Sequence, residues 1–221
     1  MPWQAQALTL SIATLVATLA LGWGEYRGPR ALVYAAKPLA TLLILALAVA
    51  APPGADPRVA RWILAGLVFS LAGDVLLMLP SDRFAAGLTS FLVAHVCYIA
   101  AFTREMGFGF SPAALLPLLL AGALMLRLLA PGLGALRVPV IVYTSVLIAM
   151  AWQAVERSLA LPDSGPVLAA VGACLFVASD STLALARFHR PFASSHGIVY
   201  ATYFAAQWLI ALSLHPAAGV T

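Results

Sequence analysis

The fold class is decided by stretches such as residues 61–79, which read RWILAGLVFSLAGDVLLML. After the opening Arg61, Asp74 is the one charged side chain in this stretch. An apolar segment of about 20 residues can cross the hydrocarbon core of a bilayer as a helix. Similar segments span Gln4–Trp23, Ala31–Ala51, Phe84–Phe102, Pro112–Leu129, Val138–Ala154, Pro166–Ala186 and Ser195–Leu214. The sequence therefore predicts an all-α, polytopic membrane bundle of about eight transmembrane helices.

The composition excludes an ordinary soluble protein. Of 221 residues, 63% are hydrophobic and 9% are charged, whereas soluble domains carry about 25% charged residues. No polar stretch is long enough for a second domain, so we expect one transmembrane domain over residues 1–221. The Arg residues are scattered at segment ends, which argues against a nucleic-acid partner. Cys97 and Cys174 lie in apolar runs and are predicted to be core thiols without a disulfide.

Basic residues in the links predict the orientation. The odd-numbered links and their flanks hold Arg27, Arg30, Lys37, Arg83, Arg127, Arg137, Arg187 and Arg190. The even-numbered links hold Arg58, Arg61, Arg104 and Arg157. Because basic residues favour the cytoplasmic side, we expect the odd-numbered links in the cytoplasm and both termini outside. A strong preference for Arg over Lys, with abundant Ala, Leu and Gly, suggests a GC-rich bacterial genome, and we expect the protein in the bacterial cytoplasmic (inner) membrane.

The two halves of the chain resemble each other. Residues 72–77, AGDVLL, are similar to residues 178–183, ASDSTL, and the same offset places Lys37 on Tyr143. This pattern predicts half-repeats over residues 1–106 and 107–221, related about an axis along the membrane normal. Chance similarity between apolar segments is the alternative.

Nearly every charged residue lies in a link or at the end of a predicted span, but three clearly do not: Lys37, Asp74 and Asp180. Such groups cost at least about 2.5–3.5 kcal/mol each at a helix centre and usually mark function. Less costly polar residues accompany them at His95, Tyr98, Tyr143, Ser179, Ser181, His196, Tyr200, Tyr203 and Gln207.

The depths of these residues agree. From a rise of 1.5 Å per residue, the two Asp residues, Lys37 and Tyr143 lie roughly 8–10 Å below the face that carries the odd-numbered links. We therefore expect one polar cavity opening toward that face, with His95 and Gln207 deeper as its floor. Structural alternatives exist: Lys37 could reach the interface or pair with one Asp, His95 could be an interior histidine, and the tyrosines could form an interfacial belt.

A pair of carboxyl groups at one depth suits general-acid chemistry. One protonated acid and one carboxylate form the arrangement that glycosidases use on acetal-type substrates, where an oxocarbenium-like cation develops. The sequence contains no Gly-x-Ser-x-Gly elbow, His-Glu-x-x-His motif or P-loop. A zinc-dependent lipid hydrolase using Asp74, His95, Asp180 and His196 remains an alternative.

The sequence resembles the YhhN family. The likeness rests on residues 73–78 (GDVLLM), Phe84–Leu88, Ala94-His95, Phe176–Ser181, residues 203–210 (YFAAQWLI) and the pair Lys37-Pro38. Members of this family include lysoplasmalogenases, which hydrolyse the vinyl ether of lysoplasmalogens to a fatty aldehyde and a glycerophospho-choline or -ethanolamine.

The resemblance implies a membrane ether hydrolase that acts on a lysophospholipid and needs no cofactor or metal. It implies Asp74 and Asp180 as the catalytic residues. We expect substrate-binding or supporting roles for Lys37, His95, Tyr98, Tyr143, Ser179, Ser181, Tyr200, Tyr203 and Gln207. Two alternatives belong to other classes: a proton- or cation-coupled transporter that uses the two Asp residues, and a sensor that binds lipid without chemistry.

Overall fold

A computed structural model describes residues 2–52, 54–161 and 163–215. Within these ranges the chain forms eight α-helices and no strand, as the sequence predicts. The helices are α1 (Pro2–Tyr26), α2 (Arg30–Val49), α3 (Pro57–Met78), α4 (Phe84–Phe102), α5 (Pro112–Leu129), α6 (Arg137–Ala160), α7 (Ser164–Phe188) and α8 (Ser195–Leu212). Two 3₁₀ turns, Ala130–Gly132 and Gly134–Leu136, lie between α5 and α6.

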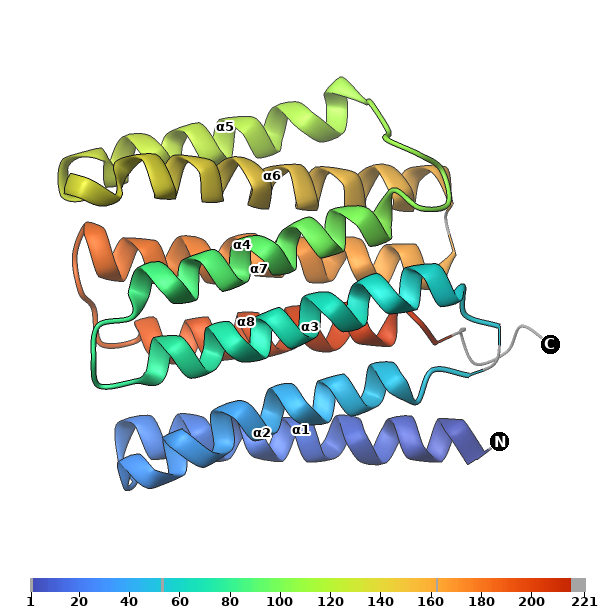
Figure 1. Ribbon diagram of the computed structural model, residues 1–221, viewed down its shortest axis with the longest axis horizontal. Coiled ribbons are helices and arrows are strands. Elements are labelled where there is room, and N and C mark those ends of the chain that lie inside the picture. Colours follow the sequence, from blue (N-terminus) through green and yellow to red (C-terminus); the bar gives the residue numbers. More distant parts are fainter. Residues whose placement is uncertain (1, 53, 162, 216–221) are drawn as a thin grey trace.

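Consecutive helices run antiparallel along the length of the bundle (Figure 1). The links α1–α2, α3–α4, α5–α6 and α7–α8 lie at one end, on the left of the view, and the N-terminus lies at the other. We call the first end the odd-link end. The closest helix pairs are α3 with α4, α7 with α8 and α1 with α2, whereas α5 packs mainly on α6 at the edge.

Seven of the described helices, α1 to α7, are long and apolar enough to span a membrane by length and composition. Helix α8 is not among them, because it carries polar residues such as His196 and Gln207. It nevertheless packs along α7 as the eighth member of the bundle. Tyr203 and Gln207 of α8 face inward and are buried, whereas His196 near its start is exposed.

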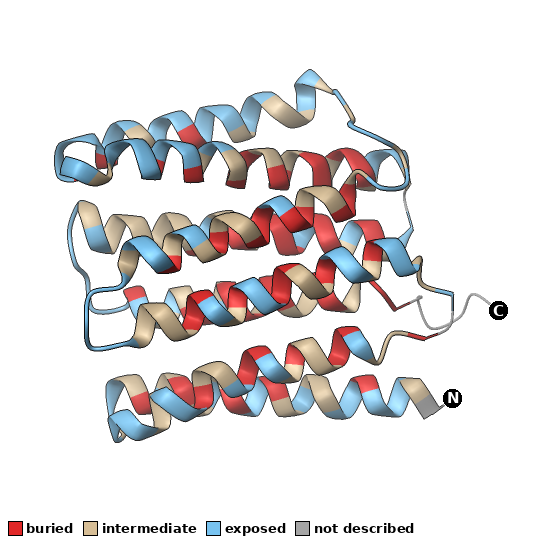
Figure 2. Ribbon diagram, in the orientation of Figure 1, coloured by how far each residue is buried: buried red, intermediate tan, exposed pale blue. Residues whose placement is uncertain are grey.

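The outer faces of the helices are apolar, and the buried residues line the interior (Figure 2). Leu120 on α5 is 73% exposed, and large exposed side chains such as Leu15 and Val68 continue this surface on other helices. Such a surface suits lipid rather than water. Cys97 is buried and Cys174 is exposed, and neither forms a disulfide. The prediction that Cys174 is a core residue is therefore wrong, because it faces outward from α7.

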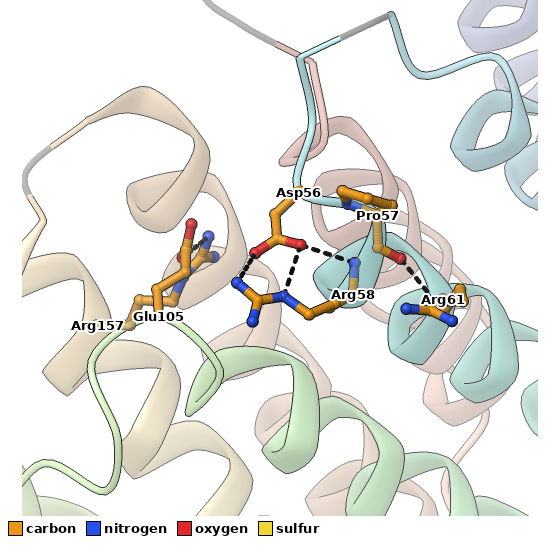
Figure 3. Close-up of polar contacts among 6 residues, drawn as sticks. All are labelled: Asp56, Pro57, Arg58, Arg61, Glu105 and Arg157. Atoms are coloured by element: carbon orange, nitrogen blue, oxygen red, sulfur yellow. Dashed lines mark hydrogen bonds and ion pairs between the residues drawn. The ribbon is translucent and has the colours of Figure 1, made fainter.

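Charged residues form hydrogen bonds and ion pairs at the end of the bundle opposite the odd-link end (Figure 3). The Asp56 side chain caps α3, accepting from the Arg58 backbone N–H at 2.7 Å. Its bond to the Arg58 side chain lowers the Asp56 pKa below the ordinary value. Arg157 donates to Glu105 at 2.6 Å. This pair explains one wrong boundary: Arg157 was predicted in a link, but α6 continues through it to Ala160.

Candidate functional site

Asp74 lies on α3, in the interior of the bundle, and is surrounded by donors. Thr41 donates to its Oδ2 at 2.6 Å and Tyr203 donates to the same oxygen at 2.7 Å. The ammonium group of Lys37 lies 3.4 Å from Oδ1. Lys37 and Thr41 are one turn apart on α2, so a single face of that helix supplies two of the three contacts. Three donors suit a carboxylate, because an ionised carboxyl only accepts hydrogen bonds.

A chain of hydrogen bonds leads to Asp74 from the neighbouring helices. Tyr98 on α4 donates to Gln207 Oε1 at 2.6 Å, and Gln207 Nε2 donates to the Tyr203 hydroxyl at 3.3 Å. Tyr203 in turn donates to Asp74. Every donor in this chain points toward the carboxyl group. The chain therefore fixes the orientation of Tyr203 and with it the donor that faces Asp74.

Two glycines allow α4 to approach α3 closely at this position. A Cβ atom on Gly66 would overlap the Tyr98 ring, and one on Gly73 would lie 2.6 Å from the Phe91 ring. Both contacts are far shorter than van der Waals distance. The Gly73-Asp74 pair thus combines the carboxyl group with the space that Phe91 needs beside it.

Asp180 on α7 has different surroundings. The Tyr143 hydroxyl, from α6, donates a short hydrogen bond to its Oδ2. His95 Nε2 lies 4.0 Å from the same oxygen, beyond hydrogen-bonding distance. Within the described ranges no Lys or Arg pairs with Asp180, whose side chain is 12% exposed. Both ring nitrogens of His95 are buried without a hydrogen-bond partner among the described residues.

The two carboxyl groups line the same cavity, which we call the polar chamber. It has a volume of about 420 Å³ and is bounded by α1, α2, α3, α7 and α8 with Phe91 of α4. Glu25, Arg30 and His196 also line it, which places its mouth at the odd-link end.

A second cavity, the apolar cavity, adjoins the polar chamber. It has a volume of about 230 Å³ and lies between α4, α5, α6 and α7. Its wall is mainly aliphatic and aromatic, with side chains such as Leu88, Met125 and Leu147. Asp180, Leu77, Phe91 and Leu183 line both cavities. Asp180 therefore stands where a polar space and an apolar space meet.

The predicted site residues divide into three groups. Those lining the polar chamber are Lys37, Asp74, Ser179, Asp180, His196, Tyr200 and Tyr203. Tyr143 and Ser181 line the apolar cavity instead, with Asp180. His95, Tyr98 and Gln207 line neither, so the predicted floor at His95 and Gln207 is not where either cavity ends. They lie buried behind the lining, where Tyr98 and Gln207 hold Tyr203.

Sequence reasoning missed Glu25, Arg30 and Thr41. Thr41 has a sequence signal, because it follows Lys37 by one helical turn on the same face. Glu25 and Arg30 border the α1–α2 link, where charged residues are ordinary. Only the packing of α1 and α2 against α8 brings them to the chamber.

The geometry also bears on the alternatives for Lys37 and for a metal. The Lys37 side chain, 12% exposed, turns inward to Asp74 rather than reaching the interface. Among the residues that the structure describes, no three His, Cys, Asp or Glu side chains gather as a group that could hold a metal ion. The four residues of the alternative zinc site thus do not form one cluster, and His196 contacts Glu25 instead, at 3.4 Å.

The two carboxyl groups have equivalent partners along the chain. Lys37 and Asp74 are 37 residues apart, as are Tyr143 and Asp180, and each partner lies on the helix preceding its Asp. This spacing accords with the predicted half-repeats, which remain a prediction.

The sequence model of the YhhN family matches residues 32–214. The membrane protein YhhN of Escherichia coli O157:H7, named as uncharacterized, is 34% identical over 86% of this chain and 91% of its own length. The human lysoplasmalogenase TMEM86B is 39% identical over 66% of this chain and 60% of its own, and a lysoplasmalogenase of Mycobacterium bovis is 34% identical over 84% and 71%. No solved structure matches. The extent of the family match and of these relatives shows that the chain belongs to the YhhN family.

Proposed function

We propose that the protein is a membrane hydrolase that cleaves the vinyl ether bond of lysoplasmalogen-type lysophospholipids. The observation that carries the proposal is the unequal pair of carboxyl groups in one chamber. Asp74 has a cation and two donors, whereas Asp180 has one donor and, among the described residues, no paired Lys or Arg. Environments that separate two carboxyls in this way are typical of an acid and a carboxylate that act together. The names of the human and mycobacterial relatives support the same activity.

Asp180 is the general acid in this proposal. Its Oδ2 accepts from Tyr143, which leaves Oδ1 to carry a proton toward the substrate. Because Asp180 lines both cavities, a vinyl ether that lies across their junction can accept this proton. Protonation of a vinyl ether occurs at the carbon remote from oxygen, and a positioned acid accelerates such a transfer by about 10²–10⁴.

Asp74 is the carboxylate that stabilises the cation. Protonation of the carbon leaves an oxocarbenium ion, and a fixed negative charge nearby lowers the free energy of that transition state. Lys37 favours the charged form of the buried Asp74, while Thr41 and Tyr203 hold its orientation.

Water completes the reaction without another reactant. It adds to the carbon of the oxocarbenium ion and returns a proton to Asp180. The hemiacetal then collapses: its hydroxyl proton passes to the ether oxygen, the carbon–oxygen bond breaks, and a carbonyl forms. The products are a fatty aldehyde and the glycerophospho alcohol, and one water molecule is consumed.

The two cavities suit the two ends of such a substrate. The hydrocarbon chain matches the apolar cavity between α4, α5, α6 and α7. The glycerophospho head matches the polar chamber, whose mouth carries charged residues at the odd-link end. With this placement the vinyl ether, which joins chain to head, lies near Asp180.

The test is aldehyde release by the purified protein in detergent. A lysoplasmalogen should yield a fatty aldehyde, detected by mass spectrometry, whereas the saturated ether analogue should not react. In D₂O, with the aldehyde trapped at once by borohydride, one deuterium should appear on the carbon next to the former carbonyl. That label reports protonation at carbon.

Two results would contradict the proposal. One is the absence of aldehyde from the wild-type protein with both choline and ethanolamine head groups. The other is aldehyde without the carbon-bound deuterium, which would exclude Asp180 as a donor to carbon even if the activity itself stands.

A further inference from the structure

The mouth of the polar chamber carries one acid and one base that the proposed chemistry does not use. Glu25 lies near the end of α1 and Arg30 begins α2, so the short α1–α2 link places both at the odd-link end, where both line the chamber. Tyr34, His196 and Tyr200 complete this region. We call these five residues the chamber mouth.

Glu25 is held in place but not neutralised by a paired Lys or Arg in the described part of the chain. Tyr200 donates to its Oε2 at 2.8 Å, and His196 Nδ1 lies 3.4 Å from Oε1. Its side chain is 24% exposed. A carboxylate that a tyrosine holds in place at the rim of a cavity can bind a cation there.

Arg30 carries the opposite charge and, unlike Glu25, is not held by another side chain in the described part of the chain. It is exposed and lines the chamber, and its guanidinium makes no hydrogen bond or ion pair with the residues that the structure describes. A guanidinium is suited to phosphate oxygens, which it binds through two parallel hydrogen bonds. Arg27, in the same link, is also exposed but does not line the chamber.

We propose that the chamber mouth is the head-group site for a zwitterionic lysophospholipid, with Arg30 on the phosphate and Glu25 on the ammonium group. The proposal rests on the lysophospholipid substrate proposed above. Tyr200, which contacts Glu25, and Tyr34, which lines the same chamber, add aromatic rings suited to a quaternary ammonium, since aromatic faces attract such cations. A phosphate and an ammonium joined by a short linker present the charge pair complementary to Arg30 and Glu25.

The experiment measures binding rather than turnover. Three uncleavable lipids with the same saturated ether chain are compared by titration: an alkyl glycerophosphocholine, an alkyl glycerophosphate and an alkylglycerol. Glu25→Gln should lower the affinity for the glycerophosphocholine lipid about tenfold or more and should not lower the affinity for the other two. Arg30→Gln should weaken both phosphate lipids by a similar factor and leave the alkylglycerol unchanged, because charge-assisted hydrogen bonds are lost.

Arg27→Gln is the matched control, since it removes the same charge from the same link and should change none of the three affinities. Glu25→Asp, which keeps the charge, should retain part of the preference for the glycerophosphocholine lipid. It thereby tests whether a folding defect explains the result with Glu25→Gln. Equal weakening of all three lipids, or none, in Glu25→Gln and Arg30→Gln would overturn the head-group site. The binding pattern can hold while the protein releases no aldehyde, so the head-group site and the proposed hydrolysis fail separately.

Discussion

Lys37 and Asp74 form an ion pair in the interior of the bundle, with Lys37 Nζ 3.4 Å from Asp74 Oδ1 and the Asp74 side chain 2% exposed. Two charges removed from water in this way stabilise each other only while both are present. The pair also gives the chamber a fixed carboxylate, which the proposed mechanism needs. Stability and catalysis should therefore respond differently when one or both partners are changed.

Removing one partner should destabilise the protein more than removing both. Lys37→Met leaves a buried, unpaired Asp74, a change that typically costs about 3–5 kcal/mol. The double variant Lys37→Met/Asp74→Asn should recover much of that loss, because no charge remains, yet stay inactive. The measurements are thermal unfolding in detergent and aldehyde release. If the double variant regained turnover, Asp74 would have no catalytic role.

Asp180→Asn should nearly abolish turnover while the protein keeps its fold. The Asn side chain can still accept from Tyr143 but cannot deliver a carboxyl proton. The expected loss is about 10²–10⁴ in rate. Asp163→Asn, at the start of α7 and exposed at the opposite end, is the matched control and should keep full activity. A variant at position 180 with more than about a tenth of wild-type turnover, an effect under about 1.4 kcal/mol, would refute the assignment.

The hydrogen-bond chain to Asp74 predicts a graded series. Tyr203→Phe removes a donor to the carboxylate itself and should lower turnover about tenfold or more. Tyr98→Phe acts further from Asp74, because it removes the hydrogen bond to Gln207, which in turn contacts Tyr203. It should lower thermal stability by roughly 1 kcal/mol and affect turnover less than Tyr203→Phe. The opposite order in turnover would mean that Tyr98, not Tyr203, governs the carboxylate.

The predicted spans agree with the helices where composition changes sharply. Helices α4 and α5 begin and end at the predicted residues, because links that contain polar, Pro or Gly residues flank both. The end of α6 was misjudged because Arg157 is a charged residue inside a helix, neutralised by Glu105 from the link before α5. A pairing between segments so far apart in the chain is not visible in local composition.

The sequence predicted how far along each helix the site residues lie, but not the direction in which each side chain points. The rise per residue predicts Lys37, Asp74 and Asp180 at a common level, and in the structure all three line the polar chamber. It carried no information on which side of its helix a residue faces, so Tyr143 was expected in the same cavity but lines the apolar one. The apolar cavity itself had no signal, because its lining consists of ordinary aliphatic residues from separate helices.

The apolar cavity should set the chain length of the substrate. Ala184 on α7 lines this cavity, and Ala184→Phe would place a ring inside it. Each methylene group kept out of an apolar site loses roughly 0.8 kcal/mol, or about fourfold in affinity. Substrates with long chains should therefore lose kcat/KM by about tenfold or more, whereas short-chain substrates, which do not reach the ring, should be nearly unaffected.

The matched control for this prediction is Ala178→Phe, which adds the same ring to the same helix at an exposed position lining neither cavity. It should leave the dependence on chain length as in the wild type. The measurement is kcat/KM for a series of lysoplasmalogens that differ only in the length of the alkenyl chain. If Ala184→Phe lowered kcat/KM equally for every length, the ring would be acting on the catalytic geometry around Asp180, and the hydrocarbon chain would have to bind elsewhere.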